Sequence, residues 1–303
     1  MSLSIKTPLL HSLPLSQRVG AKVWMKMEAM QPGGSFKIRG VGFACEQHHA
    51  QGAQRFISSS GGNAGLAVAY AGRRLGVPVI VVVPETTTAR ARSLLCLEGA
   101  EVIVHGKSWF EANELARSLQ TAADAFIHPF DDPLLWQGHA SMIDEVVADG
   151  VRPGAVVLSV GGGGLLAGVD EGLRRNGLDS VPVYAVETQG TASLQASINA
   201  GQLVEIPAVS GVATSLAARQ VCRRAYEVSR ERPVIPVQVT DQEAVEACLA
   251  YLDDHRTLVE PACGASLAML YGNKTPLDER SNVLVIVCGG STTTIESLLA
   301  MRG

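Results

Sequence analysis

Four glycine-rich segments, each next to an apolar strand-like run, constrain the fold of this chain more than any other feature. In chain order they are Gly34-Ser35-Phe36-Lys37-Ile38-Arg39-Gly40, Ser60-Gly61-Gly62-Asn63, Gly161-Gly162-Gly163-Gly164 and Cys288-Gly289-Gly290-Ser291. Continuous β-branched runs that alternate with helical stretches are typical of parallel strands with both faces covered. The sequence therefore predicts an α/β fold with an open parallel sheet and many tight turns.

The alternation of strands and helices runs along most of the chain. We predict strands at 23–27, 55–58, 79–83, 101–104, 155–160, 183–186 and 283–287, and helices at 64–75, 89–98, 109–122 and 165–175. Glycine and proline mark several of the ends, as in Gly76-Val77-Pro78 and at Gly99. Periodicity alone places no domain boundary.

Composition argues against several classes of function. The 303 residues carry a net charge of −4, which gives no support for binding to nucleic acid or a membrane surface. No apolar run reaches the roughly 18 residues that span a bilayer. Six scattered cysteines form no CxxC pair, and His128, His139, Asp131 and Asp132 match no standard metal pattern. The N-terminal residues lack the order of a signal peptide, so we expect a cytoplasmic protein.

The first segment places Lys37 beside Phe36 in a glycine-rich turn. A lysine withdrawn from water loses its proton more easily and can act as an amine nucleophile. Taken alone, the segment fits a surface lysine after a turn equally well.

The second and third segments each join a strand to a helix. Backbone N–H groups at a helix N-terminus favour an anion, so Ser60 to Asn63 could bind a carboxylate, or Asn63 could simply cap its helix. Gly161 to Gly164 could form a nest for a phosphate. The tetraglycine lacks the Lys-Ser/Thr of a nucleotide P-loop and does not match GxGxxG in register.

Together, the four segments resemble those of the pyridoxal-phosphate enzymes of the tryptophan-synthase-β fold type, and most closely the serine/threonine dehydratases of the liver type. The resemblance extends from Lys6-Thr7-Pro8 to Ser291. It implies a two-domain open parallel-sheet fold with the cofactor in the cleft between the domains. A large cofactor-binding domain would comprise 1–37 and 132–303, and a small domain would comprise 38–131.

The resemblance also assigns roles to residues. Lys37 would form the Schiff base with pyridoxal 5′-phosphate and move the substrate Cα proton, and Ser60 would relay a proton on the opposite face. The remaining cofactor contacts would come from Phe36, Asn63, Gly161, Gly162, Gly163, Gly164, Leu165 and Cys288. The substrate contacts would come from Ser59, Ser60, Gly61, Asn63, Ala64 and Phe130.

Relatives bind a monovalent cation, such as potassium, through a carboxylate and nearby oxygen atoms. The matching positions are Glu187, Thr191, Ser193, Leu216 and Ala218. Oxygen ligands suit such an ion. An ordinary hydrogen bond to Glu187 at a strand end is close to equally consistent with the sequence.

The resemblance implies a homodimeric enzyme that eliminates water and ammonia from the amino acid L-serine and also acts on L-threonine. Serine racemase, a β-replacement enzyme of the cysteine-synthase kind and a cofactor-free binding protein remain alternatives. Relatives often carry Ser or Thr at one of the positions occupied by Gly33 and Gly34, and residues 271–276 are shorter than the family pattern implies.

Overall fold

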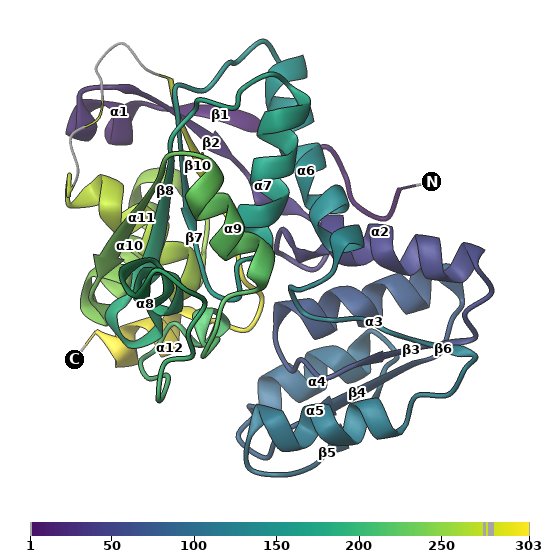
Figure 1. Ribbon diagram of the computed structural model, residues 1–303. Helices are drawn as coiled ribbons and strands as arrows, with labels where there is room; N and C mark the ends of the chain where they lie inside the picture. The colour runs from purple at the N-terminus through teal and green to yellow at the C-terminus, as the bar shows by residue number, and fades with distance from the viewer. Residues whose placement is uncertain (1, 275–276, 278–281, 303) are drawn as a thin grey trace.

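The strands of the protein form two sheets, which occupy two lobes of the molecule (Figure 1). The computed structural model describes residues 2–274, 277 and 282–302. Thr275 and Pro276, in the stretch predicted to be short, lie outside the described residues. None of the helices described is both long enough and apolar enough to cross a membrane.

The larger sheet has six strands in the order β1-β2-β10-β7-β8-β9. β1 pairs with β2 in an antiparallel manner, and the other neighbouring pairs are parallel. The strands are β1 (Leu9–Ser12), β2 (Lys22–Lys26), β7 (Ala155–Ser159), β8 (Val183–Thr188), β9 (Val234–Val239) and β10 (Asn282–Ile286). The antiparallel edge strand β1 was not predicted.

The smaller sheet has four parallel strands in the order β5-β4-β3-β6. These are β3 (Arg55–Ser58), β4 (Val79–Val83), β5 (Glu101–Val104) and β6 (Asp124–Phe126). All lie between residues 38 and 131, so we propose that the two domains divide near Lys37 and Asp132, as expected from the resemblance.

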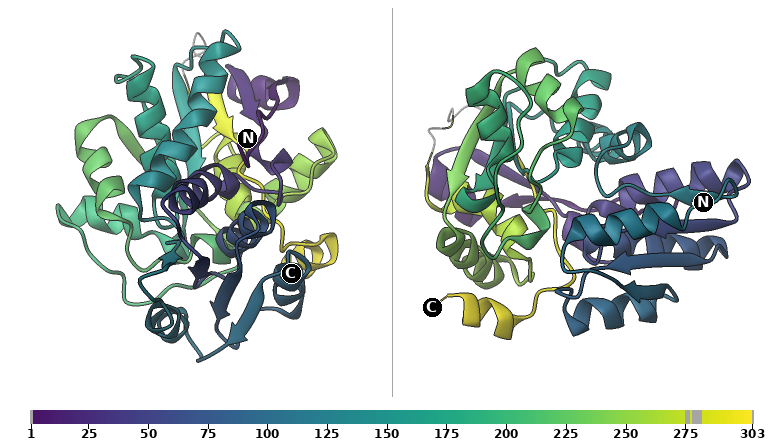
Figure 2. Two further views of the ribbon diagram at one scale, coloured as in Figure 1. Left: turned by 90° about the vertical axis from the view of Figure 1, so that its right-hand side faces the viewer. Right: turned by 60° about the horizontal axis from the view of Figure 1, so that its bottom comes forward.

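Helices cover both faces of each sheet (Figures 1 and 2). The α-helices are α1 (Leu13–Val19), α2 (Lys37–Ala50), α3 (Asn63–Leu75), α4 (Ala89–Leu97), α5 (Trp109–Ser118), α6 (Pro133–Ala148), α7 (Gly164–Arg175), α8 (Ser193–Ala200), α9 (Arg223–Glu231), α10 (Asp241–His255), α11 (Pro261–Tyr271) and α12 (Ile295–Met301). Short 3₁₀ turns are η1 (Glu28–Met30), η2 (Gln189–Thr191) and η3 (Thr214–Leu216).

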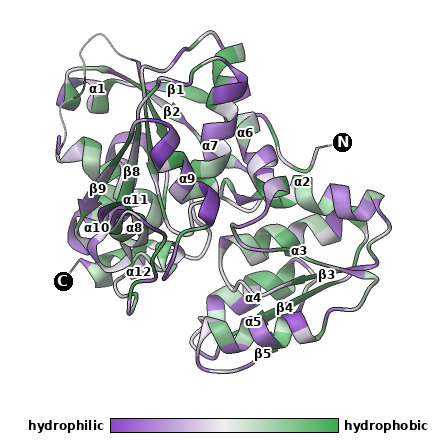
Figure 3. Ribbon diagram, in the orientation of Figure 1, coloured by the Kyte–Doolittle hydropathy of each residue, from purple (hydrophilic) through white to green (hydrophobic). Residues whose placement is uncertain are grey.

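β4 shows why these strands read as continuous apolar runs. Val79, Val81 and Val83 pack in one core with residues of α2 and α3, whereas Ile80 and Val82 pack in another with residues of α5. Figure 3 shows hydrophobic residues along strands such as β4 and β8, with hydrophilic residues on α9. The predicted parallel sheets covered on both faces are therefore confirmed.

Most predicted elements are confirmed, with ends that differ by a few residues. The largest difference is α5, which ends at Ser118 and not at residue 122. Asp124 accepts hydrogen bonds from the N–H and hydroxyl of Thr121, each at 2.8 Å. This side-chain turn competes with the helix for the backbone, which explains the earlier end.

Candidate active site

The loops that follow β2 and β10 lie side by side, because these strands are neighbours in the larger sheet. The Phe36 N–H donates to the Cys288 carbonyl at 3.1 Å, and the Gly290 N–H donates to the Gly34 carbonyl at 2.8 Å. The first and fourth glycine-rich segments therefore form one surface at the carboxyl ends of the strands, where α/β sheets bind ligands.

The second segment reaches the same surface from the smaller sheet. Asn63, the first residue of α3, accepts a hydrogen bond from the Ser291 N–H at 3.0 Å. Its Nδ2 donates to Glu260 Oε1 at 2.8 Å. Asn63 is thus held by two residues of the larger lobe.

The tetraglycine follows β7, the other neighbour of β10, and leads into α7. Within the described part of the chain, the N–H groups of Gly161 to Gly164 donate to no backbone carbonyl. A Cβ at Gly162 would lie 2.3 Å from the Phe130 ring, and Gly163 has a φ of 87°. Only glycine fits these two positions, and N–H groups without a backbone partner suit an anion such as phosphate.

Lys37 begins α2 and lies at the centre of these segments. Its Nζ donates to the Pro129 carbonyl at 2.5 Å and lies 5.2 Å from the centre of the Phe36 ring. Burial lowers the pKa of Lys37 to about 8, although Cys288 and Glu260 act in the opposite direction. The amine is therefore neutral at a mildly basic pH, as a nucleophile must be.

Cys288 follows β10 and is buried. A hydrogen bond with Cys263, together with burial, raises the pKa of the Cys288 thiol well above its ordinary value. The thiol is therefore neutral at physiological pH.

The predicted substrate residues occupy different environments. The Ser59 hydroxyl donates to Asn113 Oδ1 at 2.9 Å, so it serves the packing of α5 against β3. Ser60 is half-buried, and its hydroxyl accepts from the Gly62 N–H at 3.4 Å. A Cβ at Gly61 would lie 2.7 Å from Thr87 Cγ2. Ala64 is buried behind this loop.

The predicted cation ligands fall into two groups. Glu187 is the last residue but one of β8 and accepts the N–H groups of Leu194 and Gln195 at 2.8 and 2.9 Å, close to Ser193. Burial raises the pKa of Glu187 to about 7. Thr191 shares a 2.8 Å hydrogen bond with Thr188.

The other group comprises Leu216 and Ala218, which lie on the loop beside Gly161. In the residues that the structure describes, no three His, Cys, Asp or Glu side chains are arranged to hold a metal ion.

Glu260 is the functional candidate that sequence reasoning missed. It is 5% exposed, precedes α11 and lies beside Asn63 and Gly290. The sequence did contain a sign of a functional role, because Glu260 is the only charged residue in the apolar stretch 258–271. The Pro129 carbonyl, which accepts from Lys37, carries no comparable signal because it is a backbone atom.

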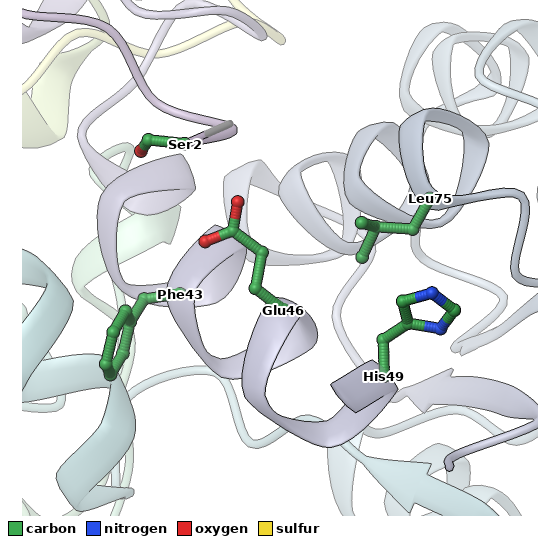
Figure 4. A pocket seen from close by; sticks show the side chains of 5 residues that line it. All are labelled: Ser2, Phe43, Glu46, His49 and Leu75. Carbon is green, nitrogen blue, oxygen red and sulfur yellow. The ribbon is translucent and has the colours of Figure 1, made fainter. Parts of the chain in front are cut away.

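A surface hollow elsewhere on the molecule contains none of these residues. It is lined by Ser2, Phe43, Glu46, His49 and Leu75, which come from the N-terminal arm, α2 and α3 (Figure 4). Because this hollow contains none of the predicted residues, we place the candidate active site at the strand ends around Lys37.

The residues present fit pyridoxal phosphate. A partly buried amine of lowered pKa stands among three loops, one of which is a glycine nest suited to a phosphate group. The two sheets and this arrangement define a pyridoxal-phosphate enzyme of the tryptophan-synthase-β fold type.

Comparisons with known proteins agree with this class. The profile of the family described as "Pyridoxal-phosphate dependent enzyme" matches residues 2–289. L-serine dehydratase of Dictyostelium discoideum is 47% identical, with 98% of this chain and 91% of the relative covered. Human L-serine dehydratase/L-threonine deaminase is 46% identical, with 99% and 95% covered. The crystal structure of a fungal L-serine ammonia-lyase from Rhizomucor miehei has a TM-score of 0.94 and 37% identity, with 100% and 99% covered.

This chain belongs to the pyridoxal-phosphate-dependent serine dehydratase and threonine deaminase family.

Proposed function

We propose that this protein converts L-serine into pyruvate and ammonia, and L-threonine into 2-oxobutyrate and ammonia, with pyridoxal phosphate as cofactor. One observation carries the proposal: a chain that matches L-serine dehydratases along nearly its whole length has a partly buried amine of lowered pKa at Lys37. In the net reaction, the β-hydroxyl leaves as water. A water molecule is then consumed when the amino group is released as ammonia.

The proposed cofactor contacts follow from the geometry of the loops. Lys37 would hold the cofactor covalently, and Phe36 would lie against its ring. The N–H groups of Gly161 to Gly164, with Leu165 at the start of α7, would bind the phosphate. When bound, pyridoxal phosphate supplies an electron sink that makes the proton on the substrate Cα acidic.

The remaining roles belong to protein groups that move protons or hold the substrate. The neutral amine of Lys37 would take the Cα proton. The loop from Ser60 to Ala64, at the N-terminus of α3, would bind the substrate carboxylate, and Ser60 would relay a proton on the other face. Phe130, which packs against the tetraglycine, would form one wall of the substrate pocket.

Cys288 would face the pyridine nitrogen. Its raised pKa keeps the thiol neutral, so it provides less stabilisation of charge on the ring than a carboxylate would. We propose that this choice favours elimination of water over transamination.

The cation site, the homodimer and the cytoplasmic location are further parts of this proposal. Glu187 and the Ser193 hydroxyl, which is buried and has no hydrogen-bond partner among the described residues, support the site for potassium. The six cysteines are free, which suits a reducing compartment. The homodimer follows from the family resemblance, and sedimentation of the purified protein tests it.

The proposal is tested by measuring pyruvate formed from L-serine by the purified protein loaded with pyridoxal phosphate. We expect turnover by the protein and by the control Lys107→Ala, an exposed lysine, and none by Lys37→Ala. Formation of D-serine, or a product that appears only with added sulfide, would instead indicate a racemase or a β-replacement enzyme. Failure to bind the cofactor would contradict the proposal altogether.

A further inference from the structure

Glu260 is a buried acid at the candidate site to which the proposed reaction assigns no role. Its side chain lies against Gly290, where a Cβ would come within 2.3 Å of the Glu260 Cδ. It also lies close enough to Lys37 for the two charges to interact. A carboxyl group that is removed from water in this way needs hydrogen-bond partners.

One partner of Glu260 is the side chain of Asn63. An asparagine amide has one acceptor oxygen and two N–H donors. The oxygen accepts from the Ser291 N–H at 3.0 Å, and one N–H donates to Glu260 Oε1 at 2.8 Å. The other N–H donates to the Ser215 hydroxyl over a longer distance, 3.4 Å. Glu260 and Ser291 therefore fix the direction of the amide, and the second N–H makes only the long contact with Ser215.

These bonds also connect the two lobes of the molecule. Asn63 begins α3, which packs on the smaller sheet, whereas Ser215, Glu260 and Ser291 belong to the larger lobe (Figure 1). Without Glu260, the Asn63 amide would keep the Ser291 N–H and the longer Ser215 contact, and could rotate.

We propose that Glu260 is a positioning residue whose carboxyl group, through its hydrogen bond to Asn63, orients the Asn63 amide for cofactor binding and joins the two lobes at the site. This inference rests on the proposed function, which assigns Asn63 to the cofactor. Glu260 acts through Asn63 and need not touch the cofactor itself.

The chemistry of the carboxyl group suggests a suitable variant. Burial raises the pKa of Glu260 to about 7, against hydrogen bonds from Ser215 and Asn63 that lower it. The group is therefore largely uncharged below pH 7. Glutamine is similar in shape, also uncharged, and its Oε1 can accept from Asn63 while its amide donates to Ser215.

The test measures the dissociation constant for pyridoxal phosphate in Glu260→Gln and Glu260→Ala, by absorbance titration of apo-protein at pH 7. We expect Glu260→Ala to weaken binding roughly tenfold, as for the loss of one buried hydrogen-bond partner, and Glu260→Gln to change it little. Ser266→Ala is the control, since Ser266 is a buried polar residue of α11 whose hydroxyl donates to the Cys263 carbonyl, away from Asn63. Thermal unfolding of each apo-variant checks that it folds.

A double-mutant cycle with Asn63→Ala separates positioning from general stability. If Glu260 acts through Asn63, adding Glu260→Ala to Asn63→Ala causes no further loss of affinity. Additive losses, or a Glu260→Gln variant as weak as Glu260→Ala, would overturn the inference. Unchanged affinity in Glu260→Ala would also overturn it and leave the proposed function intact, whereas absence of cofactor binding in the unaltered protein would remove both.

Discussion

Lys26 is buried and Lys37 is partly buried, and the two side chains have different hydrogen-bond partners. Lys26 pairs with Glu145 and donates to the Thr7 carbonyl at 2.7 Å, so its charge is compensated. Lys37 donates instead to a backbone carbonyl, that of Pro129. A lysine without a carboxylate partner is the one whose amine is more easily deprotonated.

This difference predicts how attachment of the cofactor depends on pH. Because burial lowers the pKa of Lys37 from 10.5 to about 8, the neutral amine becomes the main form above pH 8. We expect the rate at which apo-protein binds pyridoxal phosphate covalently to rise up to about pH 8 and then level off. Stopped-flow absorbance measures this rate. A lysine peptide serves as the control, and a protein profile that kept rising toward pH 10.5 like the peptide's would contradict the assignment.

Several residues of the candidate site could be identified from the sequence, because their motifs are local. Lys37, Asn63 and the tetraglycine each stand at a strand end, and parallel strands bring such ends together. Glu260 could not be placed beside Asn63 in this way. The two residues are 197 positions apart, and they meet because α11 packs on the larger sheet while α3 packs on the smaller one.

At the scale of single elements, the turn from β7 into α7 depends strongly on glycine. Gly163 has a φ of 87°, and a Cβ there would lie 2.4 Å from the Ala225 Cβ. Gly177, just beyond α7, also has a positive φ, of 65°, but faces open space. A substitution at Gly177 therefore introduces backbone strain alone, whereas one at Gly163 introduces both strain and a steric clash at the site.

We expect Gly163→Ala to weaken binding of pyridoxal phosphate roughly tenfold or more, because the loop must move to admit the methyl group. Gly177→Ala should cost about 1 kcal/mol of stability from backbone strain and leave cofactor affinity unchanged. Titration of both apo-variants measures the affinities. Equal affinities in the two variants would show that the tetraglycine does not hold the cofactor.

Elements were predictable where burial on both faces produced long apolar runs, as in β4 and β10. The edge strand β1, Leu-Leu-His-Ser, was missed because it contains no β-branched residue, unlike the equally short edge strand β5. Its antiparallel pairing with β2 depends on contacts that no local pattern records.

At the scale of the whole molecule, a buried ionic cluster joins the N-terminal arm, α2 and α6. The Arg39 guanidinium pairs with Glu28 at 2.6 Å and with Glu145 at 2.7 Å. Lys26 pairs with Glu145 at 2.5 Å. Because Arg39 lies two residues after Lys37, the cluster also fixes the start of α2, which carries the candidate nucleophile.

Removing the arginine should therefore destabilise the fold. Arg39→Met leaves the buried Glu28 carboxylate without its cation, and we expect a loss of about 3–5 kcal/mol in the free energy of unfolding. Arg73→Met, which breaks an exposed pair with Glu98, should cost less than about 1 kcal/mol. Urea unfolding measures both. Similar small losses in the two variants would contradict the importance of the cluster.

The same cluster predicts a loss of stability in acid. Burial raises the pKa of Glu145, but hydrogen bonds and charges from Arg39 and Lys26 outweigh burial and lower it below 4.5. A lowered pKa stabilises the folded state above pH 4.5, and this contribution disappears as the pH falls through the folded-state value. Glu145→Gln should therefore flatten the acid side of the stability profile measured by urea unfolding. An acid side as steep as that of the unaltered protein would contradict this role.

The central claim is that Lys37 carries the cofactor, and reductive labelling tests it most directly. The protein loaded with pyridoxal phosphate is treated with borohydride, digested, and mapped by mass spectrometry across its six lysines. We predict one pyridoxyl-phosphate group, on Lys37, and no labelled peptide from Lys37→Ala. A label on Lys26 or on any other lysine, with Lys37 unmodified, would contradict the account.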